Sequence, residues 1–298
     1  MSASDAATPG LTGLVVVDKE AGWTSHDVVA RVRKALGTKR VGHAGTLDPD
    51  ATGVLLVGVG RTTRLLRFLT PLPKTYVADV VLGEATTTLD ASGDVVGSWD
   101  MSSVTLDDVR AAAASFVGEI LQTPPMVSAV KVGGQRLHAL ARRGIEVERR
   151  ARPVTIHRLS LDPGPRSGVF SMEVTCSSGT YVRVLAADLG VALGGGAHVE
   201  NLRRVEVGQF TVDDACPVSA VGPGSVRVPL DALRHLAPVE VKPEIVDLIA
   251  RGLPLDRVPL GATGDGPWAL VDGSARLLAV YEATGTDRIR PSVVLAAR

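Results

Sequence analysis

The chain has 298 residues, of which 45% are hydrophobic and 3% aromatic, and it carries no net formal charge at pH 7. A core made mainly of Val, Leu and Ala favours a sheet with covering helices. No apolar run approaches the roughly 18 residues that a membrane-spanning helix needs, and a neutral total charge argues against a strongly nucleic-acid-binding protein.

Positive charge is nevertheless concentrated in two segments. Residues 31–67 contain eight Lys or Arg against two Asp, and residues 131–158 contain eight Lys or Arg against two Glu, so each segment has a local charge of +6. Two basic faces on a neutral molecule would suit an RNA partner. Each segment can equally be an ordinary solvated surface.

The first predicted elements follow from local patterns. Residues 1–10 lack the basic and then apolar layout of a signal peptide, so we expect a disordered tail on a cytoplasmic protein. The apolar run 14–17 predicts a short buried strand. Residues 24–36 predict a capped helix, because apolar residues recur there at helical spacing. The run 54–59 predicts a second buried strand, which a short helix through Leu69 follows.

The middle of the chain alternates between strand and helix patterns. Strands are predicted at Tyr76–Leu82, Phe170–Cys176 and Val205–Val212, and helices at Thr105–Phe116 and Val182–Leu189. The connection 122–150 is long and rich in Gly and Arg. A connection of that length is more often functional than structural.

The composition changes at Gly222-Pro223-Gly224. Beyond this point short apolar runs, such as Trp268–Val271 and Leu277–Tyr281, are separated by Gly and Asp. We therefore expect residues 229–298 to form a small β-rich domain. The chain contains no internal repeat.

The segment 42–53 reads Gly-His-Ala-Gly-Thr-Leu-Asp-Pro-Asp-Ala-Thr-Gly. Its proline pushes the preceding Asp48 out of the α region, and its glycines allow a partner to approach the backbone closely. An aspartate held in this way can cap a turn, bind a cation or attack an electrophile. Taken alone, an Asp-Pro turn would be the ordinary interpretation.

This segment resembles the catalytic motif of the TruB family, the bacterial tRNA pseudouridine-55 synthases. Further segments match that family in the same order, over about residues 11–215: Val17–Gly22, Lys74–Tyr76, Cys176–Arg183 and Gly195–Arg204. The resemblance implies an isomerase that converts uridine 55 in the T-arm loop of tRNA to pseudouridine.

The same resemblance implies the architecture. It is an α/β (α+β) fold with a mixed, largely antiparallel sheet and flanking helices. A pseudouridine synthase catalytic domain is expected over residues 11–228, with a basic RNA-clamp loop at about 124–151. The tail at 229–298 would then be a PUA-like domain that contacts RNA.

Three catalytic residues are implied by the family motifs. Asp48 matches the aspartate that acts on the glycosidic carbon, and Arg183 matches the arginine that pairs with it. Tyr76 matches the tyrosine that stacks on the target base and lies near its C5 proton. Without the resemblance, Tyr76 would be interpreted as a core residue of a strand, and Arg183 as a surface residue of a helix.

Four substrate-binding residues are implied in the same way. Tyr181 and Leu202 match residues that line the base pocket, and Lys19 matches a pocket lysine. His43 matches a histidine that helps to hold the flipped-out nucleotide. Leu202 alone would be interpreted as core.

No cofactor is expected, because this isomerisation exchanges neither electrons nor phosphates. The run Gly58–Thr63 lacks the Gly-Lys-Ser/Thr ending of a phosphate loop. The six histidines show no metal-ligand spacing, so no metal is expected. Cys176 and Cys216 do not make a disulfide framework, and Cys176 fits a small core residue.

Two positions depart from the family pattern: Glu20 stands in place of a usual proline, and Val127 in place of a frequent tyrosine. Two alternatives also remain open. One is a non-catalytic RNA-binding or RNA-chaperone protein, and the other is a guide-dependent ribosomal RNA pseudouridine synthase that relies on partner subunits. Otherwise we expect a monomer that acts on tRNA with no membrane and no protein partner.

Overall fold

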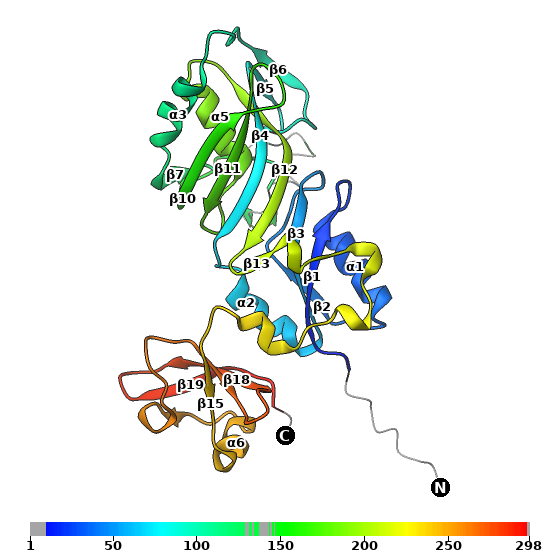
Figure 1. Cartoon of the computed structure of the whole chain (residues 1–298), viewed down its shortest axis with the longest axis vertical. Coiled ribbons are helices and arrows are strands. Elements are labelled where there is room, and N and C mark those ends of the chain that lie inside the picture. Colours follow the sequence, from blue (N-terminus) through cyan, green and yellow to red (C-terminus); the bar gives the residue numbers. More distant parts are fainter. Residues whose placement is uncertain are drawn as a thin grey trace.

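The computed structural model describes residues 10–128, 131–132, 134–136, 143, 145 and 147–296. The tail predicted at residues 1–10 lies outside this set apart from Gly10, and so does part of the predicted clamp loop. Two sheets organise the described chain (Figure 1). One belongs to the larger, N-terminal part, and the other to the predicted C-terminal domain.

The larger sheet has ten strands. They are β1 (Gly13–Lys19), β2 (Val41–Ala44), β3 (Thr52–Val59), β4 (Lys74–Leu82), β7 (Gly118–Gln122), β10 (Arg152–Pro163), β11 (Val169–Cys176), β12 (Ala197–Val207), β13 (Phe210–Thr211) and β14 (Cys216–Pro217). The strand order is β14-β1-β3-β12-β4-β11-β10-β7, with β2 beside β3 and β13 beside β12. Two pairs, β1–β14 and β12–β3, are parallel and the others antiparallel. The predicted mixed, largely antiparallel sheet is confirmed.

Helix α1 (Ser25–Ala35) forms as its sequence predicts. Thr24 caps it, and a capping box with Asp27 satisfies backbone donors of the first turn. Val28, Val29 and Val32 are buried against β1 and β3. The helix ends where Gly37 takes a left-handed φ of 60°.

Two helices cover the other half of the large sheet. Helix α3 (Leu106–Ala114) begins with a second capping box at Thr105, as expected. Helix α5 (Val182–Ala192) packs on β12 and touches α3. Both helices share one apolar core with β4, β10 and β11. Cys176 is fully buried in that core and forms no disulfide.

One predicted strand is displaced in the structure. A strand was expected at 205–212, but β12 begins at Ala197 and ends at Val207. Gly208 takes a left-handed φ of 57° there, which turns the chain back into β13. The apolar residues on either side of this turn therefore belong to two antiparallel strands rather than one.

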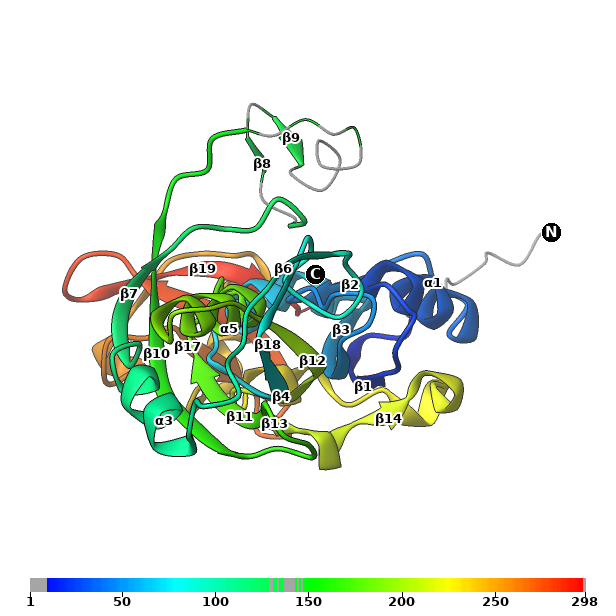
Figure 2. The same cartoon turned by 90° about the horizontal axis from the view of Figure 1, so that it is seen from above.

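Two short ribbons extend from the large sheet. β5 (Glu84–Thr86) pairs with β6 (Val95–Ser98), and β8 (Lys131–Val132) pairs with β9 (Gln135–Arg136). Figure 2 shows the β8–β9 ribbon standing away from the sheet, at the end of the connection between β7 and β10. This connection contains the predicted clamp loop.

The C-terminal part forms the second sheet, with β15 (Pro238–Glu240), β16 (Leu255–Asp256), β17 (Trp268–Val271), β18 (Leu277–Ala283) and β19 (Arg288–Val294) around helix α6 (Pro243–Ala250). The strands predicted at 268–271 and 277–281 are confirmed. One apolar cluster joins this sheet to β1, β3 and the short helices η1 (Gly60–Leu65) and α2 (Leu66–Leu69). Among the described helices, none is long and apolar enough to cross a bilayer.

Candidate active site

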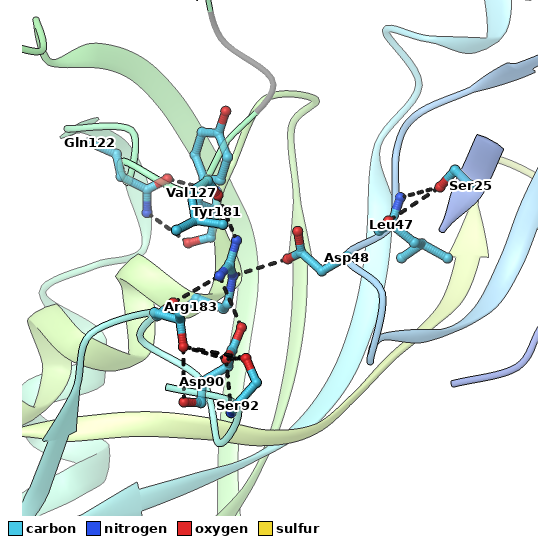
Figure 3. Close-up of polar contacts among 10 residues, drawn as sticks. Ser25, Leu47, Asp48, Asp90, Ser92, Gln122, Val127, Tyr181 and Arg183 are labelled. Carbon is cyan, nitrogen blue, oxygen red and sulfur yellow. Dashed lines mark hydrogen bonds and ion pairs between the residues drawn. The ribbon is translucent and has the colours of Figure 1, made fainter. Parts of the chain in front are cut away.

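The loop that carries Asp48 connects β2 to β3, and its neighbours on both sides are anchored. The Leu47 backbone N–H donates to the Ser25 hydroxyl at 2.9 Å, and that hydroxyl lies 3.2 Å from the Leu47 carbonyl (Figure 3). On the other side, the Pro49 carbonyl accepts from the Gly22 N–H at 3.0 Å. The backbone at Asp48 is therefore held in place while its side chain stays 39% exposed.

Lys19 lies behind this loop. Its side chain is fully buried, and Nζ donates to the carbonyls of Glu20, Trp23 and Pro49 at 2.7–2.9 Å. Burial lowers the pKa of Lys19 to about 8, although the charges of Asp50 and Asp48 oppose the shift. The resemblance implied a pocket lysine here, but the structure places Lys19 behind the loop, outside the set of described residues that line the cavity. Glu20, in place of the proline that is usual in the family, does not disturb this contact, because Lys19 Nζ donates to the backbone carbonyl of residue 20.

Arg183 forms the ion pair expected for Asp48. Its Nε lies 3.0 Å from Asp48 Oδ2, and its side chain is only 4% exposed. It is the second residue of α5 and points into the site rather than into solvent (Figure 3). Its Nη2 also donates to the Val127 carbonyl at 3.1 Å. Since Val127 contributes a backbone group, its departure from the family pattern does not remove this contact.

Asp90 is a member of the site that the sequence patterns did not reveal. Arg183 Nη1 lies 2.9 Å from Asp90 Oδ2, so one guanidinium connects two carboxylates. Burial raises the pKa of Asp90, but hydrogen bonds from Ser92 and Thr88 and the charge of Arg183 outweigh it and lower the pKa overall. The sequence signal here is an Asp-Ala-Ser-Gly turn, which indicates a local hydrogen bond and gives no hint of a distant arginine.

The two carboxylates differ in their electrostatics. Burial raises the pKa of Asp48 above its ordinary value, while Arg183 lowers it and Asp90 raises it further. Asp48 has fewer donors than Asp90 and sits at the cavity wall. Arg183 is therefore the main group that favours its charged form.

A cavity of about 230 Å³ opens beside this pair. It brings together five of the seven residues that the resemblance implied: Asp48, Tyr76, Tyr181, Arg183 and Leu202. These residues come from the β2–β3 loop, β4, the start of α5 and β12, so distant parts of the chain meet there. Lys74 and Arg204, which no prediction singled out as site residues, also line it.

The two tyrosines are held in different ways. Tyr76 is buried on β4, where burial raises its pKa, although the charge of Arg204 and a hydrogen bond with it lower the pKa. Tyr181 precedes α5, and its backbone is clamped by Gln122: the N–H donates to Oε1 at 2.7 Å and the carbonyl accepts from Nε2 at 3.1 Å (Figure 3). Gln122 ends β7, so the root of the β7–β10 connection is attached to the site. No local pattern predicted this contact.

His43 lies on β2, next to the cavity rather than in its described lining. Its ring packs edge-on against His26, with centroids 5.5 Å apart. Burial lowers the pKa of His43 to about 4, with help from the charges of His26 and Arg204. The imidazole is therefore neutral at physiological pH. Across the described residues, no group of three or more His, Cys, Asp or Glu side chains is placed to hold a metal ion.

The sequence also matches known protein families. The TruB family pseudouridylate synthase (N terminal domain) model matches residues 33–182, and the tRNA pseudouridylate synthase B C-terminal domain model matches residues 183–223. A tRNA pseudouridine synthase B of Rhodococcus jostii is 46% identical over 100% of this chain and 98% of its own length. One of Mycobacterium tuberculosis is 43% identical over 95% of each chain.

Solved structures give a parallel result. A Cbf5-Nop10-Gar1 complex contains a chain that superposes with a TM-score of 0.75 and 28% identity, covering 97% of this chain and 87% of that one. An H/ACA RNP bound to a substrate RNA containing 2′-deoxyuridine gives a TM-score of 0.72 at 25% identity, covering 96% and 86%. From the family models and the near full-length relatives, the chain belongs to the TruB family of pseudouridine synthases.

Proposed function

We propose that this chain converts uridine 55 in the T-arm loop of tRNA into pseudouridine. The observation that carries the proposal is the Asp48–Arg183 pair, 3.0 Å apart, at the wall of a cavity that also contains Tyr76. Relatives named tRNA pseudouridine synthase B support tRNA as the substrate. The reaction belongs to the cytoplasm, where tRNA matures in bacteria.

Asp48 is the residue proposed to act on the sugar. Breaking the N1–C1′ bond leaves an oxocarbenium-like C1′, which a carboxylate stabilises or traps. The carboxylate must be ionised, and its pKa is raised by burial. Arg183 opposes that shift, so it supports the form of Asp48 that the reaction needs.

The base is proposed to enter the cavity by flipping out of the RNA stack. The Tyr76 ring would stack on it, and Tyr181 and Leu202 would close around it. His43, just outside the cavity, would contact the RNA next to the extruded nucleotide. A closed pocket of this kind excludes water, so the detached uracil can turn and rejoin C1′ through C5.

Folded RNA is recognised through its backbone, its shape and exposed loop bases. The basic connection between β7 and β10 is proposed to clamp the T-arm, since Gln122 and Val127 join its root to Tyr181 and Arg183. Residues 11–228 would act as the catalytic domain, and 229–298 as a PUA-like domain that contacts RNA. A monomer would suffice, with no cofactor and no protein partner.

The decisive experiment uses one purified chain and an unmodified tRNA transcript. We expect pseudouridine at position 55, mapped by a chemical method specific for that nucleoside, with no guide RNA added. Asp48→Asn should bind the transcript and form no product. A protein that binds tRNA yet never forms pseudouridine would support the RNA-chaperone alternative. Activity that appears only with a guide RNA and partner subunits would support the ribosomal RNA alternative.

A further inference from the structure

Two buried cations line the cavity beside Tyr76. Lys74 is 6% exposed and Arg204 is 1% exposed, and they lie on the neighbouring strands β4 and β12. Both side chains converge on Gly45 of the Asp48 loop. A Cβ atom at Gly45 would lie 3.4 Å from Arg204 Nη1 and 3.6 Å from Lys74 Cε.

Neutral groups satisfy the hydrogen bonds of these cations. Lys74 Nζ donates to the carbonyls of Thr70 and Leu72 at 2.8 and 2.6 Å. Arg204 donates through Nε to the Val54 carbonyl at 2.7 Å and through Nη2 to the Gly45 carbonyl at 3.0 Å. Within the described ranges, neither cation takes part in an ion pair.

Two buried positive charges are unfavourable when, as among the described residues, no carboxylate pairs with them. Burial and the nearby Arg204 together lower the pKa of Lys74 to about 8, because both disfavour its charged form. The pair therefore favours a ligand that brings negative charge to this part of the cavity. Asp48 already pairs with Arg183. Lys74 and Arg204 would therefore interact with a different negative charge.

The position of Tyr76 indicates which part of a substrate would meet these cations. Tyr76 follows Lys74 by two residues on β4, so both side chains lie on the same face of the strand. Arg204 is its partner across the β4–β12 pair. Under the proposed function, the sugar of a base that is stacked on Tyr76 faces Asp48. The ring of that base would then lie toward Lys74 and Arg204, the cations beside Tyr76.

We propose that Lys74 and Arg204 stabilise the negative charge on the uracil while it is detached from the ribose. This inference rests on the proposed function. When the N1–C1′ bond breaks, its electron pair leaves with N1 and spreads onto O2 and O4, while C1′ becomes electron-deficient and faces the Asp48 carboxylate. When C5 bonds to the electron-deficient C1′, the negative charge of the base is neutralised. The proton on C5 is then lost and N1 takes up a proton, which gives neutral pseudouridine. The site then places negative charge beside the sugar and positive charge beside the base.

A phosphate of the target nucleotide is the other anion that these cations could hold. The two sources differ in when the negative charge is present. A phosphate is charged in the bound ground state, so removal of a cation would weaken RNA binding. The detached uracil is charged only after bond cleavage, so removal of a cation would slow the chemical step at saturating RNA.

The test compares RNA with uridine and with 5-fluorouridine at the target position. Fluorine withdraws electrons and makes the base a better leaving group that needs less help. The readout is single-turnover loss of the starting nucleoside at saturating RNA, because fluorine on C5 blocks the last proton loss. Lys74→Met should slow the uridine substrate by about 10²–10³-fold, and the fluorinated substrate clearly less. Its RNA dissociation constant should change little.

Charge-retaining variants complete the design. Lys74→Arg and Arg204→Lys should recover a large part of the rate that Lys74→Met and Arg204→Met lose. Arg203→Met is the matched control, since Arg203 lies next to Arg204 on β12 but pairs with Asp18. It should leave the ratio of the two substrate rates unchanged. If a melting experiment shows that Arg204→Met does not fold, Lys74→Met and Arg204→Lys still test the inference.

Equal rate reductions on the two substrates, or an effect confined to the dissociation constant, would overturn this inference and leave the proposed function standing. The second of these results would assign the cations to a phosphate. An active wild-type chain separates the two questions. A wild type that forms no pseudouridine on tRNA would overturn both proposals together.

Discussion

Asp90 and Asp48 are bound by different nitrogens of one guanidinium. Arg183 Nη1 lies 2.9 Å from Asp90 Oδ2, and Arg183 Nε lies 3.0 Å from Asp48 Oδ2 (Figure 3). Asp90 is itself fixed by Thr88 and Ser92. It therefore orients the arginine that faces the proposed reacting carboxylate, although Asp90 is not among the described residues that line the cavity.

The first prediction concerns this positioning role. Asp90→Asn keeps the shape of the side chain and removes its charge, so Arg183 loses one of its two carboxylate partners. We expect kcat to fall by about 10²-fold, as is typical when a reacting group is displaced by about 1 Å. The dissociation constant for tRNA should stay unchanged, and both values can be read from single-turnover kinetics over a range of enzyme concentrations.

Asp100→Asn is the matched control for this variant. Asp100 forms the same kind of turn, accepting from Ser102 as Asp90 accepts from Ser92, but it is exposed and its described contacts include no arginine. Its substitution should leave kcat near the wild-type value. Equal activity in Asp90→Asn and Asp100→Asn would show that Asp90 only shapes its own loop.

The second prediction concerns Tyr76. Tyr76→Leu removes the aromatic face and should weaken transition-state stabilisation by about 1–3 kcal/mol, the usual contribution of stacking on a base. Tyr76→Phe keeps the ring but loses the hydroxyl that faces Arg204. Substantial turnover in the Phe variant would indicate stacking alone, whereas slow turnover would indicate that the hydroxyl relays the C5 proton.

Tyr281→Phe provides the comparison for the removal of a buried tyrosine hydroxyl. Tyr281 is fully buried in the C-terminal sheet, and its hydroxyl donates to the Leu253 carbonyl at 2.9 Å. This variant should retain turnover. If both Tyr76 variants turn over normally and keep the thermal stability of the wild type, Tyr76 is an ordinary core residue.

Local features of the fold could be predicted from the sequence. Thr24 and Thr105 both cap helices through boxes that are visible in the sequence, and the alternating strand at 170–176 lies within β11. The displaced strand at 205–212 shows the limit of such patterns. Apolar spacing alone does not distinguish one strand from two that are joined by a turn at Gly208.

The candidate site shows the same limit of local sequence patterns. Asp48, Tyr76 and Arg183 could be named as candidates because each lies in a short motif, and the structure brings them to one cavity. Asp90, Gln122 and the Lys74–Arg204 pair were missed because their importance arises from contacts across the fold. Arg183 and Asp90 are 93 residues apart, and Gln122 and Tyr181 are 59 apart. Lys19 and His43 carry matching motif letters, yet their surroundings differ from those of lining residues, and only three-dimensional packing decides that.

The third prediction uses the lowered pKa of His43. The unfolded chain would protonate His43 near its ordinary value of 6.5, whereas the folded chain resists protonation until about pH 4. Between these values the unfolded state binds more protons, so the contribution to stability is complete above about pH 6.5 and is lost as the pH falls toward 4. His43→Gln should therefore show a smaller decrease of unfolding free energy between pH 7 and 4.5 than the wild type.

Urea unfolding at the two pH values measures this difference. His157→Gln is the control, because His157 is exposed on β10, and its pH dependence should follow that of the wild type. In the wild type, an NMR titration should place the midpoint of the His43 ring near pH 4. A midpoint near 6.5 would mean that water reaches the ring freely.

The fourth prediction concerns the β7–β10 connection. Arg143 and Arg150 are exposed there, while Arg142 lies outside the described residues. Replacing Arg143 and Arg150 with Gln should weaken tRNA binding and flatten its salt dependence, by about 0.7–0.9 in slope for each phosphate that is no longer neutralised. Catalysis at saturating RNA should fall less than affinity, because neither arginine lines the cavity.

The control is a double variant, Arg110→Gln with Arg158→Gln. It removes two charges that already pair with Asp162 and Glu173, so it should keep the wild-type salt slope. If both double variants bind tRNA with the wild-type affinity and slope, the connection is only a solvated loop and the RNA follows another path.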